Sequence, residues 1–305
     1  MYELLGCSTH YGVPNKGDGL TECVRTLNRR LLDHPIREIP ERTLPEENLP
    51  NLKYLNSVAA TCWDIAAAVD EIKRRGNTPL FIGGDHSAAI GSISGDAATE
   101  NRLGLLWIDA HSDINTDAST ITGNIHGMPV SALMGFGSEK LCSVYGEEPK
   151  VLPENAVLFG LRDVDPLEAE IIERLNVKCY YFSEIMQRGL DACLDEARAY
   201  LSGIGRLHVS FDLDSMDPAY IKGVSVPVSD GFLEQDVLHI FERILPAYDV
   251  SMIDIVEFNP KRDTDGETGA FAERLIRRIL SGAFLTNDRI SFACDKIIKK
   301  TSKKA

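Results

Sequence analysis

Short apolar runs recur along the whole chain and alternate with longer amphipathic stretches. A short apolar run between turn residues is typical of a buried strand, whereas apolar residues three and four positions apart mark one face of a helix. The segments predicted as strands are residues 3–7, 80–83, 104–109, 156–161, 178–182, 206–213 and 250–257. Their alternation with helices predicts an α/β fold of three layers, α/β/α, with a mainly parallel central sheet.

The predicted helices cover residues 20–32, 53–74, 86–98, 166–175, 190–201, 234–245 and 267–280. Asp165, followed by Pro166 and Glu168, has the form of a capping box at a helix start. The stretches at 35–50, 113–124, 135–154 and 214–231 are predicted to be irregular. Because no repeat or change of composition divides the chain, we expect residues 1–305 to form a single domain.

Composition narrows the class of protein. With 305 residues and 44% hydrophobic content, the chain can bury a large core. A net charge of −14 argues against nucleic acid or an anionic membrane surface as a partner. No run approaches the ~20 apolar residues of a membrane helix, the start lacks signal-peptide features, and the seven dispersed cysteines indicate reduced thiols. We therefore expect a soluble, cytoplasmic protein.

The last ten residues, 296–305, carry five lysines. A basic terminus of this kind is usually a solvated, frayed end. The alternative is a role in contacts between subunits.

Three predicted strands end in residues that commonly bind metal ions. Asp109, His111 and Asp113 follow one apolar run at a spacing of two, which places their side chains on the same face of a strand. A lone aspartate there is usually a turn residue or a helix cap, but several carboxylates packed together repel one another and require a cation. The predicted ligands are His86, Asp109, His111, Asp113, Asp212 and Asp214. This oxygen-rich set suits a divalent ion such as Mn²⁺ better than structural Zn²⁺.

Four segments, in this order, resemble the motifs of the ureohydrolases, the family of arginases, agmatinases, guanidinobutyrases and formiminoglutamases. They are Gly83-Gly84-Asp85-His86-Ser87, Asp109-Ala110-His111-Ser112-Asp113, Ser210-Phe211-Asp212-Leu213-Asp214 and Asp217-Pro218. The resemblance implies an arginase-like domain over nearly the whole chain and a homo-oligomer, either a trimer or a hexamer. It also implies two Mn²⁺ ions bridged by a hydroxide that attacks a small guanidino substrate.

Motif positions in this family imply a role for each ligand. One ion would be held by His86, Asp109, Asp113 and Asp212, and the other by Asp109, His111, Asp212 and Asp214. Asp109 and Asp212 would thus bridge the two ions, and Asp113 would also orient the hydroxide. Asp85 is expected to support His86 or to pack, not to bind metal.

Two further residues match catalytic positions of the family. Glu257 would accept two parallel hydrogen bonds from the guanidinium, and His126 would pass a proton to the departing amine. The alternatives are a plain strand-end acid for Glu257 and a packed loop residue for His126.

Substrate recognition rests on three more positions, which look most similar to those of arginases. Asn115 and Thr122 would donate hydrogen bonds to an α-carboxylate, and Asp165 would face an α-amino group. The resemblance implies hydrolysis of L-arginine to L-ornithine and urea. Asn115 as a turn residue, Thr122 as a loop hydroxyl and Asp165 as a helix cap are the alternatives, and they leave agmatinase, guanidinobutyrase or formiminoglutamase activity open.

The loop after Asp217-Pro218 departs from the arginase pattern. Val226 stands where arginases have a threonine near the guanidinium, and Asp230 stands where they have a glycine. A lost hydroxyl costs ~1 kcal/mol of hydrogen bonding, so weaker turnover or another guanidino substrate is the expected consequence.

Two other classes of function compete. The first is a two-metal phosphoesterase, which would need basic side chains to meet the extra negative charge of a phosphoester, and the nearby loops supply few. A deacetylase belongs to the same class of alternatives, because histone-deacetylase relatives have a related fold. A metal-binding scaffold would leave Glu257 and His126 without a task.

Overall fold

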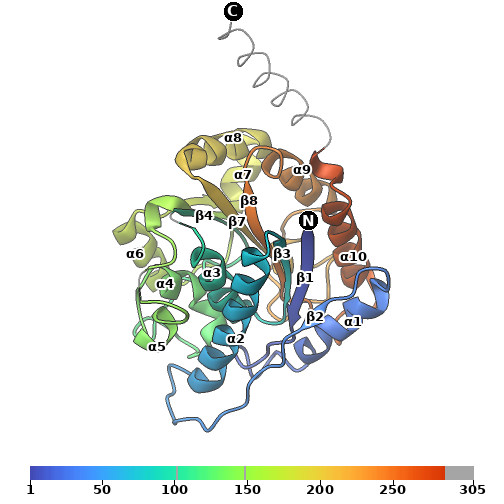
Figure 1. Ribbon diagram of the computed structural model, residues 1–305. Helices are drawn as coiled ribbons and strands as arrows, with labels where there is room; N and C mark the ends of the chain where they lie inside the picture. The colour runs from blue at the N-terminus through green and yellow to red at the C-terminus, as the bar shows by residue number, and fades with distance from the viewer. Residues whose placement is uncertain (101, 148, 286–305) are drawn as a thin grey trace, which may run out of the picture.

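The computed structural model describes residues 1–100, 102–147 and 149–285. The basic tail at 296–305 and Cys294 lie outside these residues. Within the described ranges, eight strands form one sheet in the order β2-β1-β3-β8-β7-β4-β5-β6, and every neighbouring pair is parallel (Figure 1). The strands are β1 Tyr2–Cys7, β2 Arg37–Glu38, β3 Thr78–Gly83, β4 Leu103–Ile108, β5 Ala156–Leu161, β6 Lys178–Tyr181, β7 Arg206–Asp212 and β8 Val250–Val256.

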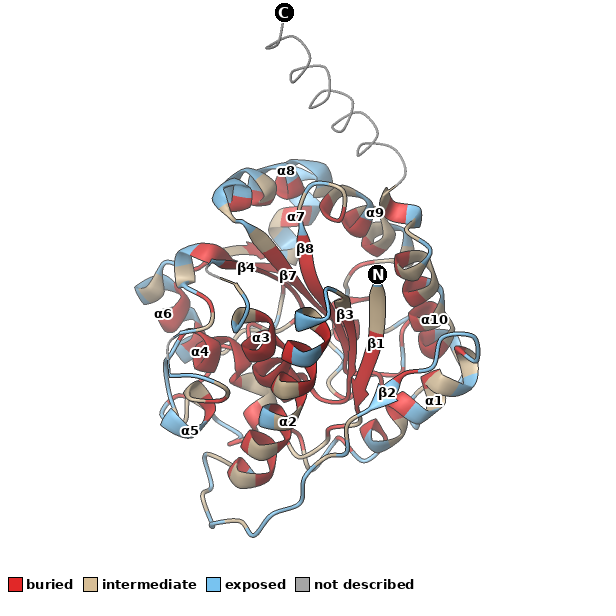
Figure 2. Cartoon of the chain, viewed as in Figure 1, coloured by how far each residue is buried: buried red, intermediate tan, exposed pale blue. Residues whose placement is uncertain are grey.

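Helices cover both faces of this sheet. They are α1 Cys23–Arg30, α2 Leu55–Arg74, α3 Ala89–Ala97, α4 Pro129–Leu133, α5 Glu139–Cys142, α6 Pro166–Leu175, α7 Phe182–Arg188, α8 Leu190–Tyr200, α9 Glu234–Ile244 and α10 Glu267–Leu280. One apolar cluster joins α1 and α7–α10 to one face of the strands, and others join α2, α3, α4 and α6 to the opposite face. Strands β4, β5 and β8 are buried along their whole length (Figure 2). The predicted three-layer α/β architecture is confirmed.

The sequence missed the shortest elements. Strand β2 lies inside the stretch predicted as irregular at 35–50, and α5 lies inside the one at 135–154, so the prediction is wrong at both places. Helices α4 and α7 were not predicted either. Strand β2 has two exposed residues and α5 a single helical turn, so neither carries enough periodicity to be recognised. No helix among the described residues is both long enough and apolar enough to cross a membrane.

A buried network of charges links the sheet to α2 and α3. His208 of β7 lies between two carboxylates, with Nδ1 2.8 Å from Asp96 Oδ2 and Nε2 3.0 Å from Asp254 Oδ2. Lys73 of α2 also contacts the Asp96 carboxylate and lies 2.9 Å from Glu100 Oε1. His208, Asp96 and Asp254 are fully buried. Because buried charges are costly without partners, this network holds the two helices in one position on the sheet.

Because of this network, the stability of the fold should decrease at alkaline pH. Burial alone would lower the pKa of His208, but Asp254 and Asp96 outweigh it and raise the pKa to about 9. The unfolded value is about 6.5, so the stabilisation is complete below that pH and is lost as the pH rises through 9. We expect the free energy of unfolding to fall over this range in chemical denaturation. His208→Gln should flatten that part of the profile; an unchanged slope would contradict the assignment.

Candidate metal centre

The predicted ligands meet at the carboxyl edge of the sheet, where four neighbouring strands end. Asp109 directly follows β4, Asp212 ends β7, and Glu257 directly follows β8. His86 lies three residues beyond β3, which completes the row β3-β8-β7-β4. Because parallel strands end at the same edge, the fold places side chains from distant parts of the chain in one cluster.

His86 is the centre of the first cluster. Its Nδ1 lies 3.0 Å from Asp109 Oδ2, 3.1 Å from Asp212 Oδ2 and 3.2 Å from Asp113 Oδ2. A single ring nitrogen can donate at most one hydrogen bond, so three carboxylate oxygens around it form a better site for a cation than for a proton. His86, Asp109 and Asp212 have the geometry of a metal-binding group.

A second cluster shares Asp109 with the first. His111 Nδ1 lies 3.2 Å from Asp214 Oδ2 and 3.5 Å from Asp109 Oδ1, and these three residues also have the geometry of a metal-binding group. The structure therefore brings together all six predicted ligands and places Asp109 between the two groups. Asp212 belongs only to the first group, so its predicted bridging role stays a prediction.

The electrostatics of the clusters fit bound cations. Burial raises the pKa of Asp212 well above its ordinary value, and the charges of Asp214 and Asp109 add to the rise. Asp214 Oδ1 is buried and has no hydrogen-bond partner among the described residues. Burial, together with the charge of Asp109, raises the pKa of Asp113 to about 7. Carboxylates in this position can all remain ionised only beside positive charge.

Neighbouring side chains fix the orientation of the ligands. The rings of Trp107 and His86 stack with centroids 3.8 Å apart, and Trp107 Nε1 donates to Asp109 Oδ2 at 2.9 Å. Ser210 Oγ lies 2.9 Å from His86 Nε2, so Nδ1 is the nitrogen that faces the carboxylates. No motif in the sequence indicates this stacking contact of Trp107.

Glu257 and His126 lie beside the first cluster. His126 Nδ1 is 3.4 Å from Glu257 Oε1, and that oxygen also accepts a hydrogen bond from the His86 backbone N–H at 3.0 Å. Glu257 Oε2 is buried without a partner among the described residues. Glu257 also holds a left-handed backbone angle of φ 64°, which costs free energy in a residue other than glycine. A free oxygen on a fixed carboxylate is suited to accept from a cationic ligand.

Of the two roles predicted for Asp85, it is fully buried, as packing requires, and it does not support the His86 ring among the described hydrogen bonds. Its carboxylate accepts hydrogen bonds from the backbone N–H groups of Gly12 and Ser87, not from the His86 ring. Gly12 O in turn accepts from the His126 backbone N–H at 3.2 Å. An added Cβ at Gly12 would lie 2.0 Å from Asp85 Oδ1, so only glycine fits there. The loop after β1 thus positions His126, a role that no motif indicates.

The predicted recognition residues are only partly brought together. Asn115 Nδ2 donates to Asp165 Oδ2 at 3.4 Å, and Asn115 Oδ1 accepts from Ser119 Oγ at 2.8 Å. Thr122 is exposed, and its hydroxyl accepts from the Asn124 N–H. No contact among the described residues joins Thr122 to Asn115 or to Asp165.

Glu168 connects the Asp109–Asp113 segment to α6. Its Oε1 accepts from Ser112 Oγ at 2.7 Å and its Oε2 from the Asp165 N–H at 2.9 Å, as expected for the reciprocal half of a capping box. Burial raises the pKa of Glu168. The sequence identified Glu168 only as part of the cap; its contact with Ser112, inside the Asp109–Asp113 segment, comes from the tertiary fold.

The two departures from the arginase pattern lie in the loop after β7. Asp230 is exposed and has φ 63°, a left-handed angle that favours glycine and explains why a glycine would be preferred there. Val226 is half-buried, while the neighbouring Ser225 Oγ accepts a hydrogen bond from Asn259 Nδ2 at 3.1 Å. The loop is therefore attached to the segment that follows Glu257.

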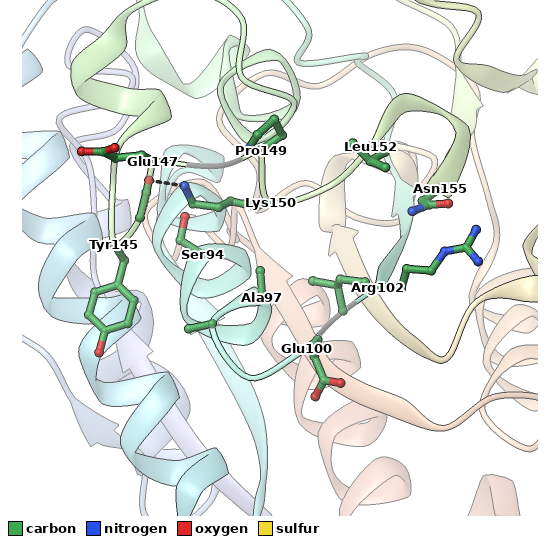
Figure 3. A pocket seen from close by; sticks show the side chains of 13 residues that line it. Ser94, Ala97, Glu100, Arg102, Tyr145, Glu147, Pro149, Lys150, Leu152 and Asn155 are labelled. Carbon is green, nitrogen blue, oxygen red and sulfur yellow. Dashed lines mark hydrogen bonds between the residues drawn. The ribbon is translucent and has the colours of Figure 1, made fainter.

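A separate cavity lies away from the metal centre. A cavity of about 500 Å³ lies at the amino edge of the sheet, beside Arg102 just before β4 and Asn155 just before β5 (Figure 3). Side chains from α3, including Ser94 and Ala97, complete part of its wall. None of the predicted site residues lines it. The chemistry of the side chains identifies the candidate site.

Known proteins place this arrangement in a family. Residues 19–282 match the model of the arginase family. The arginase of Bacillus caldovelox is 38% identical over 226 residues, 74% of this chain and 76% of that protein. The Bacillus subtilis arginase structure superposes with a TM-score of 0.82 at 32% identity, covering 94% of this chain and 99% of the other. The Entamoeba histolytica arginase, solved with L-ornithine, gives a TM-score of 0.82 at 26% identity, covering 90% and 96%.

The fold and the site define a protein of the three-layer α/β class with carboxylate and histidine clusters at its strand ends. The chain belongs to the arginase family, and it is therefore an amidinohydrolase.

Proposed function

We propose that this protein is a binuclear Mn²⁺ hydrolase that converts L-arginine to L-ornithine and urea. The observation that carries the proposal is Glu257, a buried carboxylate beside the first metal-type cluster, whose Oε2 has no hydrogen-bond partner among the described residues. The Entamoeba histolytica arginase with bound L-ornithine, which this chain resembles, supports the choice of product. A cytoplasmic homo-oligomer, trimeric or hexameric, is the proposed assembly.

The proposed ligand sets combine the two clusters with the family resemblance, which adds Asp113 to the first set and Asp212 to the second. His86, Asp109, Asp113 and Asp212 would hold one ion, and Asp109, His111, Asp212 and Asp214 the other. When bound, two such cations lower the pKa of a water molecule and make a nucleophile available near neutral pH. Asp113, whose carboxylate faces His86 from a backbone angle of φ 48°, would accept a hydrogen bond from that nucleophile and orient it.

The remaining side chains would bind and protonate the substrate. Glu257 Oε2 would accept from the guanidinium and hold its carbon against the nucleophile. His126, 3.4 Å from Glu257, would deliver a proton to the departing amine nitrogen. Asn115 and Thr122 would meet the α-carboxylate and Asp165 the α-ammonium group.

One observation favours a sister activity. Thr122 is exposed and, among the described residues, its hydroxyl is bonded within its own loop, and Val226 removes a hydroxyl from the loop after β7. An agmatinase, guanidinobutyrase or formiminoglutamase would not need an intact α-carboxylate site of the arginase kind. This is the second candidate function.

A substrate panel separates the two candidates. Urea release from arginine, agmatine and guanidinobutyrate should be measured with Mn²⁺-loaded protein and again with Asn115→Ala. Arginine should be preferred, and the variant should lower kcat/KM for arginine while leaving agmatine turnover unchanged. A preference of the unmodified protein for agmatine, or equal losses on both substrates, would contradict the arginase proposal.

The role of His126 is tested by His126→Asn. The rate at neutral pH should fall ~10²-fold because a proton donor to the leaving amine is lost. Metal content, measured by elemental analysis, should stay at two ions per chain. His34→Asn, at an exposed histidine, is the matched control. Loss of bound metal from the His126 variant would instead identify His126 as a ligand.

A further inference from the structure

Arg162, which follows β5, holds an unusual set of partners. Its guanidinium donates to five backbone carbonyl oxygens and to no carboxylate among its described hydrogen bonds. Nη2 lies 2.7 Å from Asp214 O, Nη1 lies 3.1 Å from Ser215 O, and Nε lies 3.2 Å from Ser229 O. Nη2, which carries two N–H groups, faces three of these oxygens, those of Asp214, Met216 and Val228, so one of its hydrogens is shared between two acceptors.

The five carbonyls come from two separate segments. Asp214, Ser215 and Met216 directly follow β7, whereas Val228 and Ser229 lie further along the same loop. We call residues 213–231 the selectivity loop, because it contains Val226 and Asp230. Arg162 joins the beginning of this loop to its end, beside two backbone hydrogen bonds of Phe232, its N–H to Ser215 O and its carbonyl from the Asp217 N–H.

The loop is shaped to let the guanidinium approach. Gly231 has φ +136°, and an added Cβ would lie 2.8 Å from Arg162 Nη2 and 2.6 Å from the Met216 carbonyl carbon. The aromatic ring of Phe182 lies 5.8 Å from Arg162 Cζ, within range of a cation–π contact. Glycine at position 231 and an aromatic ring at position 182 are both consistent with a built site for this side chain.

The contact with Asp214 reaches the metal centre. Arg162 fixes the Asp214 carbonyl, and Asp212 Oδ1 accepts from the Asp214 N–H at 2.6 Å. Both backbone polar groups of Asp214 are therefore held, which leaves its side chain directed at His111, 3.2 Å away. Any shift of the Arg162 contacts would move this carboxylate and the loop together.

We propose that Arg162 is a positioning residue whose side chain holds both Asp214 and the selectivity loop in place. It couples the retention of one metal ion to substrate selectivity without touching the substrate. The part of the inference that concerns metal retention rests on the proposed function, whereas the part that concerns the arrangement of the loop does not. Lysine cannot replace it, because an ammonium group has no planar fork with which to span both segments.

The test compares Arg162→Lys with Arg174→Lys, the same exchange at an exposed position near the end of α6. Mn²⁺ titration of the metal-free proteins should show one of two affinities lowered ~10–100-fold in the Arg162 variant, a loss typical of groups that support metal ligands. Hydrogen exchange of the metal-free variant should accelerate in residues 213–231 and stay unchanged in β3 and β8. The Arg174 variant should match the unmodified protein.

Gly231→Ala provides a second route to the same result. Its Cβ would press on the backbone of Met216 and Asp217 as well as on the guanidinium, whose charge is kept, so it should reproduce both the selective loss of one ion and the faster exchange of the loop. Unchanged exchange in residues 213–231 in both variants would overturn the proposal, as would equal weakening of both ions. Failure of the unmodified protein to bind Mn²⁺ would reject the proposed function instead, and the exchange experiment would still decide the role of Arg162.

Discussion

Replacement of Asp109 by asparagine should abolish urea release and strip both metal ions from the protein. Asp109 contributes oxygens to both clusters, 3.0 Å from His86 Nδ1 and 3.5 Å from His111 Nδ1. The amide keeps the shape but removes the charge that both sites share. The loss should exceed the ~10–100-fold that follows from removing a supporting group outside the ligand shell. Elemental analysis and a urea assay measure the two effects.

Asp249→Asn is the matched control for this experiment. Asp249 is exposed and directly precedes β8, at the edge of the sheet away from the clusters. Its variant should bind metal and turn over substrate as the unmodified protein does. Retention of one tightly bound ion and measurable activity in the Asp109 variant would show that Asp109 is not shared.

Asp96→Asn should destabilise the fold more than any exposed substitution. Removing this charge leaves His208 and Lys73 buried with one acidic partner each, Asp254 and Glu100. Breaking a buried ion pair from one side costs on the order of 3–5 kcal/mol, because the remaining charge is uncompensated. Urea-induced unfolding of the metal-free protein, monitored by circular dichroism, measures the change.

Asp195→Asn, at an exposed position of α8, is the control. It should change the free energy of unfolding little, since exposed ion pairs contribute only ~0–1 kcal/mol. A loss in Asp96→Asn no larger than in this control would show that the network contributes no net stability.

The apolar runs were sufficient to predict the main strands, because parallel strands covered on both faces are continuously hydrophobic. Helices Pro166–Leu175 and Glu267–Leu280 have the predicted bounds. Strand β2 was missed because its two residues are exposed and pair with β1 only after the chain has folded. Local pattern cannot reveal an element that depends on a partner distant in sequence.

The same limit applies to the site. Spacing of two residues and the resemblance to ureohydrolases were sufficient to select six side chains that the fold brings together. The roles of Arg162 and Asp85 were not predictable. Asp85 meets Gly12 across 73 positions, and Arg162 meets Ser229 across 67. Their partners are backbone groups, which carry no signature in the sequence.

The metal-type ligands stand at the ends of β4 and β7 and just beyond β3, whereas Asn115, Thr122 and Val226 stand in the loops that follow. In the proposed function, the strand ends would hold the ions and the loops would select the substrate. A change of guanidino substrate would then be expected to need changes mainly in the loops. The same division offers protein engineers a graft point, provided that the transplanted loop keeps the carbonyls that Arg162 requires.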